Sequence, residues 1–297
     1  MKNEYLISLS SDYQSGATVG LMMPGPEQLP DGGQHFPSPQ QGMLSDQYIE
    51  CVEKEAEMRR GKTLIEIFNG DATEDGRVFK AEQIVSPNTE VHKNIFRKSF
   101  DYRLRKVRHN KSKGDLLYFV GGTGAHVGNS FQHENSLAKD FYAIPFLKPT
   151  DPDGDDGWFV WDHLIMTVNG ILFDIAHQGA GVGRRPWTWE NSLYNTIKGV
   201  YFECLEMGLP VPRYWIRAHN HRYTKATYYG KTATITGIIM PCFELRSHHI
   251  TKVSGAQTIA DIGQIYIDVG KDGKHQLHEK VKRIAERRLP GMIQVIR

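Results

Sequence analysis

The feature that most constrains the fold is a recurring pattern in which a short apolar stretch ends in side chains of metal-binding types. Apolar, β-rich composition predicts such strands at 4–10, 63–68, 116–120, 171–176 and 214–217. Open α/β sheets place their binding sites at the carboxyl ends of strands. We therefore expect these five strand ends to meet at one site.

Helical patterns separate the early strands, and a hairpin interrupts the later ones. We expect helices at 45–60, 88–109, 130–142 and 188–207, and further strands at 158–168, 232–239 and 263–269. Asn169-Gly170 lies between two β-rich stretches, which is a strong hairpin signal. A basic strand or helix is expected after residue 273.

These elements predict an α/β (α+β) sandwich. Because no linker-like stretch divides residues 1–297, we expect a single domain. A long loop rich in Gly, Pro and Gln is expected at 12–42. Loops of this length in a compact domain are commonly functional or mobile.

Composition narrows the class of protein. The chain has 39% hydrophobic and 24% charged residues and a net charge of +2, which fits a globular protein without a global attraction to polyanions. Its three cysteines lie far apart, so a disulfide framework is not expected. The first residues lack the pattern of a signal peptide, and no apolar run is long enough to cross a membrane. We therefore expect a cytoplasmic location.

The fifth strand end carries two histidines, His219 and His221, with Asn220 between them. In an extended segment, residues i and i+2 point to the same side, so both imidazoles could address one pocket. Chance is the alternative, since the chain has 13 histidines. The other strand ends add Asp12, Gln14, Asp71, Thr123, His126 and His177. Carboxylates, imidazoles and amide oxygens together suit divalent metals, and a shared Asp is typical of a two-metal hydrolytic centre.

The order of these motifs resembles that of the calcineurin-like metallophosphoesterases. Their pattern is D-x-H, G-D, G-N-H-[DE], a lone His and G-H-x-H, each after a strand. The matching positions span about 210 residues and are Asp12-x-Gln14, Gly70-Asp71, Gly122-Thr-Gly-Ala-His126, His177 and Ala218-His219-x-His221. Thr18-Val-Gly-Leu, Asp31-Gly-Gly and Gly122-Thr-x-x-His-Val-Gly are similar to a subgroup found in bacteriophages and prophages.

The resemblance implies two facing mixed β-sheets flanked by helices, and a role for each matching residue. One metal would be bound by Asp12, Gln14 and His221, a second by His177, His219 and Thr123, with Asp71 bridging them. A water between the ions would attack phosphorus. His126 would protonate the leaving oxygen, and Arg184 or Arg185 would neutralise phosphoryl charge.

The sequence departs from the family pattern at several positions. Gln14 replaces a His, and its harder oxygen favours Mn²⁺ or Mg²⁺ over Zn²⁺ at that position or leaves the position partly empty. Mn²⁺ is the metal that we expect first, with Mg²⁺, Zn²⁺ or Fe as alternatives. Thr123 stands where the family has a metal-binding Asn, and Ala218 replaces a Gly. His126 lies three residues beyond Thr123 instead of following it directly. His126 is therefore either the proton donor or a metal ligand.

Each site residue also has a structural interpretation when taken alone. Asp12 and Asp71 could be helix caps or turn residues, and Thr123 could belong to a tight turn. His177 could be a core histidine that closes the hairpin arm. Taken together with the histidine pair, these residues favour the metal interpretation.

A basic stretch covers 93–113, with Asp101 as its only acid. Interleaved aromatic residues predict a helix whose apolar face packs while the basic face stays exposed. The basic face is either a solvated surface or a contact for a nucleic-acid backbone.

The expected function is that of a hydrolase acting on phosphoric esters, most specifically a phosphodiesterase or nuclease that uses two divalent ions. One alternative is a phosphomonoesterase acting on phosphoprotein or nucleotide. The other is a catalytically weak fold used for nucleic-acid binding or in a virion. Substrate, metal identity, filling of both metal sites and oligomeric state are not determined by the sequence.

Overall fold

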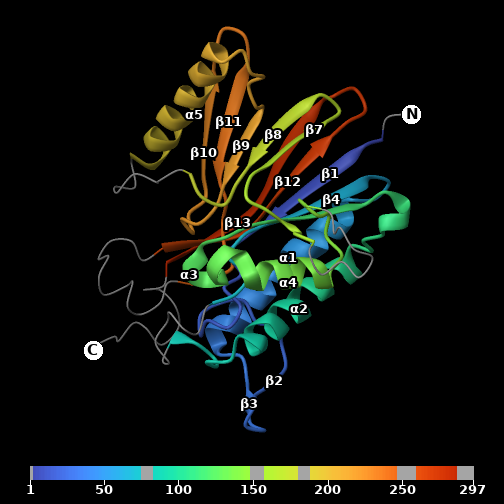
Figure 1. The fold of residues 1–297 in the computed structure, drawn as a ribbon, viewed down its shortest axis with the longest axis vertical. Coiled ribbons are helices and arrows are strands. Elements are labelled where there is room, and N and C mark those ends of the chain that lie inside the picture. The colour runs from blue at the N-terminus through green and yellow to red at the C-terminus, as the bar shows by residue number, and fades with distance from the viewer. Residues whose placement is uncertain (1–2, 75–82, 148–156, 180–187, 246–258, 286–297) are drawn as a thin grey trace, which may run out of the picture.

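The computed structural model describes residues 3–74, 83–147, 157–179, 188–245 and 259–285. Two β-sheets face each other (Figure 1). The six-stranded sheet has the order β13-β12-β1-β4-β5-β6. Its strands are β1 Tyr5–Ser10, β4 Thr63–Asn69, β5 Leu116–Val120, β6 Val160–Trp161, β12 Ile259–Val269 and β13 His275–Ala285.

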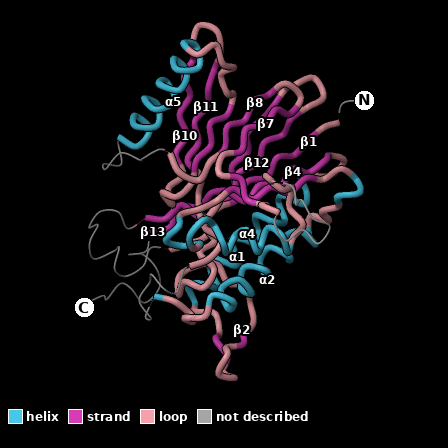
Figure 2. Tube along the Cα trace, in the orientation of Figure 1, coloured by secondary structure: helices cyan, strands magenta, loops and turns pink. Residues whose placement is uncertain are grey.

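The five-stranded sheet has the order β10-β11-β9-β8-β7. Its strands are β7 Leu164–Val168, β8 Ile171–Ile175, β9 Tyr214–Arg217, β10 Thr224–Tyr229 and β11 Thr234–Ile239. Both sheets are mixed. β1, β4, β5 and β6 run parallel, as do β8, β9 and β11, whereas β12, β13, β7 and β10 form antiparallel pairs. Figure 2 shows strands filling the centre and helices on both outer sides. The helices are α1 Pro39–Met58, α2 Thr89–Lys106, α3 Gly124–Val127, α4 Gln132–Asp140 and α5 Trp189–Glu206.

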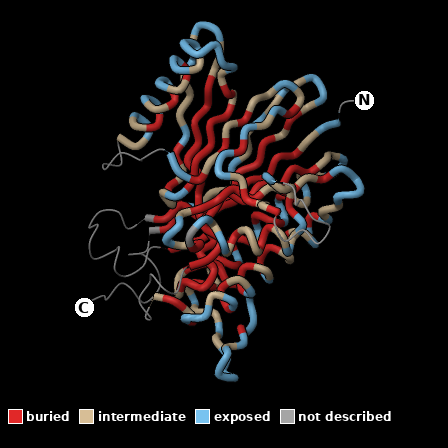
Figure 3. The backbone as a smooth tube through the Cα atoms, viewed as in Figure 1, coloured by how far each residue is buried: buried red, intermediate tan, exposed pale blue. Residues whose placement is uncertain are grey.

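The layers follow from the alternation of side chains along each strand. Ile7 of β1 packs between the sheets with Phe173 and Ile216, whereas its neighbour Leu6 packs against α1 and α2 with Tyr48. On the far side, α5 covers the five-stranded sheet, because its Leu193 and Ile197 pack against Trp215 of β9 and Ile235 of β11. The inner strands β1, β4 and β9 are buried on both faces (Figure 3). The expected sandwich of two facing mixed sheets flanked by helices is confirmed.

The hairpin is also confirmed, and its physical basis is visible in the backbone. Asn169 and Gly170 both have positive φ, 48° and 90°, which suits the right-handed twist of the flanking strands β7 and β8. No helix in the described ranges is long and apolar enough to cross a bilayer.

Three element predictions are wrong in detail. Helix α1 begins at Pro39, not at Ser45, because Ser38 and Gln41 form a capping box. The predicted strand at 158–168 is two strands, since β6 pairs with β5 and β7 pairs with β8 in the other sheet. Strand β10 was not predicted. The predicted loop at 12–42 contains the short ladder of β2 Glu27–Gln28 with β3 Gln34–His35.

The apolar face of helix α2 packs through Phe96 and Phe100 as predicted, and Lys98, Arg105 and Lys106 are exposed, but one residue of the basic stretch differs from the prediction. Arg103 is completely buried. Several other cations of the stretch form ion pairs with acids from elsewhere: Arg97 with Asp140, Lys98 with Glu27, and Lys106 with Glu53. Tertiary neighbours thus neutralise much of a charge run that looks uncompensated in the sequence.

Candidate metal centre

The loops that follow β1, β4, β5, β8 and β9 converge where the two sheets meet. Within the six-stranded sheet, the amide of Asp12 donates to the carbonyl of Gly70 at 2.9 Å. Between the sheets, Asn69 Nδ2 donates to the carbonyl of Ala176 at 3.2 Å. These bonds bring Asp12, Asp71 and His177 together, although they are far apart in the sequence.

Many of the residues at this convergence have left-handed backbone conformations. The φ angles are 52° for Asp12, 45° for Gln14, 59° for Asp71, 69° for His219 and 52° for His221. Such conformations cost non-glycine residues on the order of 1 kcal/mol or more and concentrate at functional sites. They turn the chain sharply at each strand end, so the side chain faces the site.

Two glycines allow the loops to approach one another closely. A Cβ on Gly122 would lie 2.2 Å from the amide nitrogen of Asp71. A Cβ on Gly70, whose φ is +82°, would lie 2.3 Å from Nδ1 of His177. The G-D and Gly-Gly-Thr sequences therefore have a steric role, because any side chain would push the loops apart.

Asp71 is central to the arrangement. Its Oδ2 atom lies 3.1 Å from His177 Nε2 and 3.8 Å from His219 Nδ1. These three residues can present ligand atoms that all lie within 4.8 Å of one another. Gln14 Nε2 donates to the same Oδ2 at 3.2 Å, and the amide of Thr123 donates to Oδ1 at 2.5 Å.

A second group forms around Asp12. Its Oδ1 atom lies 3.2 Å from His221 Nε2 and 3.9 Å from His177 Nε2. Metal–ligand bonds of about 2.1 Å at right angles place two donor atoms about 3 Å apart. The Asp12–His221 and Asp71–His177 distances match that spacing.

Both histidines are oriented by their second ring nitrogen. His177 Nδ1 donates to the carbonyl of Asn69 at 2.7 Å, since a carbonyl can only accept. His221 Nδ1 faces Glu244 Oε2 at 3.1 Å. Each contact directs Nε2 toward a carboxylate of the site, which is how metal-binding histidines are held in proteins.

The buried donor atoms of the site have the chemistry that divalent ions require. Three buried atoms at the site make no hydrogen bond of standard geometry: Gln14 Oε1, Asp12 Oδ1 and His177 Nε2, of which the last two face an ion-pair partner at 3.2 and 3.1 Å. A buried polar atom without a partner costs about 1–3 kcal/mol. All three are donor types that divalent metals accept, so ions would satisfy them.

Thr123 and His126 line the opening of the site. Thr123 Oγ1 lies 3.0 Å from His219 Nδ1 and accepts a hydrogen bond from Gln178 Nε2 at 3.3 Å. His126, in α3, faces Glu74 Oε2 through Nδ1 at 3.1 Å, and its Nε2 lies 3.9 Å from Asp71 Oδ2. The structure thus brings together every described residue that the sequence placed at the site. Arg184 and Arg185 lie outside the described residues.

Burial and charge shift the pKa values of the protein groups. Burial would lower the pKa of His177, but the charges of Asp71 and Asp12 raise it to about 10. Burial would raise the pKa of Asp71, but His177, and then His219 and His126, hold it well below its usual range. Burial also opposes protonation of His126, yet Glu74 and then Asp71 raise its pKa to about 9. Without a metal ion, His177 therefore binds a proton at neutral pH.

Sequence reasoning missed three buried acids beside the ligands. Glu74 orients His126, Glu244 orients His221, and Glu134 accepts from the amides of Ala72 and Gly122 at 3.2 and 2.8 Å. Burial raises the pKa of Glu74 to about 7 and that of Glu134 to about 8. A local signal exists only for Glu74, which follows Asp71 by three residues.

The described residues line at least two large concave surfaces. One, of about 1100 Å³, adjoins the site at Gly122 and His177 and extends along α5 to Met207 and Leu209. The other, of about 1240 Å³, includes Thr63, at the opposite end of β4 from Asp71. We regard the first as relevant to chemistry, because it contains a residue of the site.

No family model matches the sequence, and no curated protein matches it. The structure is similar to that of a predicted phosphoesterase from Streptococcus pneumoniae TIGR4, with 8% identity, a TM-score of 0.33, and coverage of 96% of this chain and 100% of that one. It is also similar to the sulfate thiohydrolase SoxB of Thermus thermophilus, with 12% identity and a TM-score of 0.38, covering 98% of this chain and 59% of that one.

The NAD nucleotidase NadN of Haemophilus influenzae is similar at 10% identity and a TM-score of 0.39, covering 93% of this chain and 55% of that one. This chain therefore spans less than two thirds of the SoxB and NadN chains. At such identities and TM-scores, these similarities assign no role to any residue.

Proposed function

We propose that this protein is a metal-dependent hydrolase of phosphate esters. The observation that carries the proposal is the convergence of three buried donor atoms, Asp12 Oδ1, Gln14 Oε1 and His177 Nε2, around the carboxylate of Asp71, none of them in a hydrogen bond of standard geometry. A carboxylate, an amide oxygen and an imidazole in this arrangement suit divalent ions.

We assign Asp12, Gln14 and His221 to one ion, and His177, His219 and Thr123 to a second, with Asp71 shared. When bound, divalent ions lower the pKa of water and neutralise charge on phosphoryl oxygens. The oxygen-rich donor set favours Mn²⁺, and then Mg²⁺, over Zn²⁺. Thr123 also orients Asp71 through its backbone amide.

His126 is proposed as the proton donor to the leaving oxygen. Glu74 holds its Nδ1, so Nε2 is directed toward Asp71 and the opening of the site. The hydrogen bond to Glu74, and then the charge of Asp71, raise the pKa of the imidazole to about 9 and so keep a proton on it at neutral pH. A donor in that state can stabilise a developing alkoxide.

Within this class we propose a phosphodiester substrate, with nucleic acid as the polymeric form. The groove beside His177 supports a bulky ester, because its volume of about 1100 Å³ exceeds the needs of a lone phosphoryl group. A phosphomonoester on a nucleotide or phosphoprotein would also fit this groove. It remains the alternative.

The test starts from protein stripped with a chelator and reloaded with Mn²⁺, Mg²⁺ or Zn²⁺. We expect Mn²⁺-dependent hydrolysis of bis-p-nitrophenyl phosphate, faster than that of p-nitrophenyl phosphate, and loss of at least about a thousandfold in Asp71→Asn. Faster monoester hydrolysis would replace the diesterase assignment. A protein that binds no metal, and whose rate is unchanged in Asp71→Asn, would contradict the hydrolase itself.

A further inference from the structure

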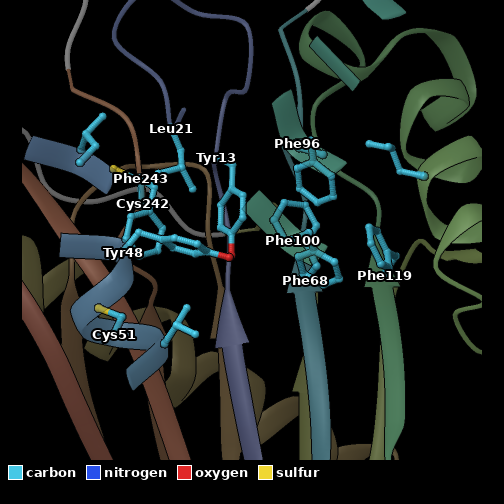
Figure 4. Packing of buried hydrophobic residues seen from close by; sticks show 14 of the residues in the cluster. Tyr13, Leu21, Tyr48, Cys51, Phe68, Phe96, Phe100, Phe119, Cys242 and Phe243 are labelled. Carbon is cyan, nitrogen blue, oxygen red and sulfur yellow. The ribbon is translucent and has the colours of Figure 1, made fainter. Parts of the chain in front are cut away.

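Tyr13 lies between two proposed metal ligands, Asp12 and Gln14, yet its side chain points into the core. It is completely buried and packs edge-on against Tyr48, Phe68 and Phe243, with ring centroids 5.4, 5.0 and 5.5 Å away. Figure 4 shows its ring standing among these aromatic residues. In the segment 12–14, the side chains of Asp12 and Gln14 thus face the site, while that of Tyr13 is fixed in the core on the opposite side.

The anchor is Arg103, the buried cation of α2. Its Nη1 atom donates to the hydroxyl of Tyr13 at 3.1 Å and also to Ser10 Oγ. Its Nε donates to Glu55 Oε2 of α1 at 2.9 Å. Its Nη2 donates to Ser8 Oγ of β1 at 2.9 Å and pairs with Glu66 Oε1 of β4 at 2.5 Å. One guanidinium therefore joins two helices and two strands beneath the site.

The position of the Nη1 contacts matters most. Ser10 is the last residue of β1, and Tyr13 follows the sharp turn at Asp12, where φ is 52°. A single nitrogen atom thus contacts the residues on both sides of the turn that carries Asp12. The Tyr13 hydroxyl also donates to Ser10 Oγ at 3.1 Å, so Arg103, Ser10 and Tyr13 are all bonded to one another.

Stability alone is a poor explanation for this cluster. Arg103, Glu55 and Glu66 have fully buried side chains, and removing charges from water costs several kcal/mol per ion. Apolar side chains of similar volume often give equal or greater stability. A guanidinium offers something that they cannot, which is several donors in a rigid planar fork.

We propose that Arg103 is a positioning residue that acts through Tyr13 and Ser10 to hold the Asp12–Gln14 turn in its ligand-presenting conformation. The guanidinium stabilises the left-handed backbone at Asp12. The carboxylate of Asp12 and the side-chain amide of Gln14 are therefore already oriented toward the site in the absence of a metal ion. The expected effect of Arg103 on metal affinity rests on the proposed function. Its effect on the conformation of the Asp12–Gln14 turn does not.

The sharpest test removes one hydroxyl. Tyr13→Phe keeps the aromatic packing and deletes the tie to Arg103. Tyr266→Phe is the matched control, because it deletes a buried hydroxyl from the same core that donates to Cys51 O at 2.7 Å and, among the described residues, has no hydrogen bond to Arg103 or Tyr13. Hydrogen exchange of metal-stripped protein would follow the amides of Asp12 and Gln14, which are bonded to Gly70 O and Asp71 O.

We expect about tenfold faster exchange of those two amides in Tyr13→Phe and no change in Tyr266→Phe. We also expect Mn²⁺ affinity, measured by calorimetry, to fall about tenfold in Tyr13→Phe only, at the lower end of effects seen for residues that support metal ligands. Melting temperatures of the two variants should be similar, which separates positioning from general stability.

Equal exchange at Asp12 and Gln14 in wild type and Tyr13→Phe would overturn the proposal. If Tyr13→Phe does not fold, Ser10→Ala removes the other hydroxyl that Arg103 Nη1 contacts beside the turn, and we expect the same result. If wild-type protein binds no Mn²⁺, the proposed function fails. The exchange measurement still decides whether Arg103 holds the turn.

Discussion

His177 Nδ1 donates a hydrogen bond of 2.7 Å to the backbone carbonyl of Asn69, and the two residues belong to the ends of strands in different sheets. In the opposite direction, the side-chain amide of Asn69 donates a hydrogen bond to the carbonyl of Ala176, the residue before His177. This reciprocal pair fixes the separation of the two sheets at the candidate site. It also decides which nitrogen of His177 is left to face Asp71.

Gly122 should tolerate no side chain. Gly122→Ala would place a Cβ 2.2 Å from the amide of Asp71, so Asp71 must move. We expect a loss of about 1–3 kcal/mol in unfolding free energy together with weaker Mn²⁺ binding, measured by denaturant titration and calorimetry. Gly124→Ala is the control, since its Cβ would meet nothing within 4 Å. Equal effects of the two changes would contradict the close approach.

Metal binding should release protons. The pKa of His177 is about 10 without a metal, because Asp71 and Asp12 outweigh the effect of burial. An ion that binds Nε2 must displace that proton, so affinity should rise with pH up to about pH 10. Calorimetry of Mn²⁺ binding at pH 8, in buffers with different ionisation enthalpies, should show about one proton released per site containing His177. No buffer dependence would contradict ligation by His177.

Metal-stripped protein should lose stability as pH rises. His177 has a folded pKa of about 10, above its unfolded value of about 6.5, so its contribution is complete below pH 6.5 and is lost as pH approaches 10. Glu134 acts in the same direction, because burial raises its pKa to about 8. We expect the melting temperature of chelator-treated protein to fall between pH 7 and 10. Saturating Mn²⁺ should reduce that fall, since the ion replaces the proton.

Glu74→Gln should impair leaving-group protonation. Glu74 faces Nδ1 of His126 at 3.1 Å and raises its pKa, and a neutral amide would do so less well. We expect kcat to fall about 10–100-fold for alkyl phosphate esters but little for p-nitrophenyl esters, whose leaving group needs no proton. His126→Ala should show the same pattern, with metal content unchanged. A loss of bound metal in His126→Ala would instead identify His126 as a ligand.

Much of the site could be predicted from the sequence because its signals are local. An apolar stretch followed by Asp, His or Gly-Asp marks a strand and the polar end of that strand, and parallel strands bring such ends together. Asp12, Asp71, His177, His219 and His221 were found in this way. The hairpin at Asn169-Gly170 and the alternation of Leu6 and Ile7 between two cores are local in the same sense.

The remaining features depend on neighbours that no local pattern encodes. Glu244 and Glu134 contact residues of the site, although no motif marks the segments that carry them. The sequence predicts Arg103 on an exposed basic face, whereas in the folded protein it is buried and paired with Glu55 and Glu66. The sequence by itself determined which side chains stand at the strand ends. The tertiary structure decided how the two sheets are joined, which charges are buried and which nitrogen of each histidine faces the site, because these depend on contacts between residues far apart in the chain.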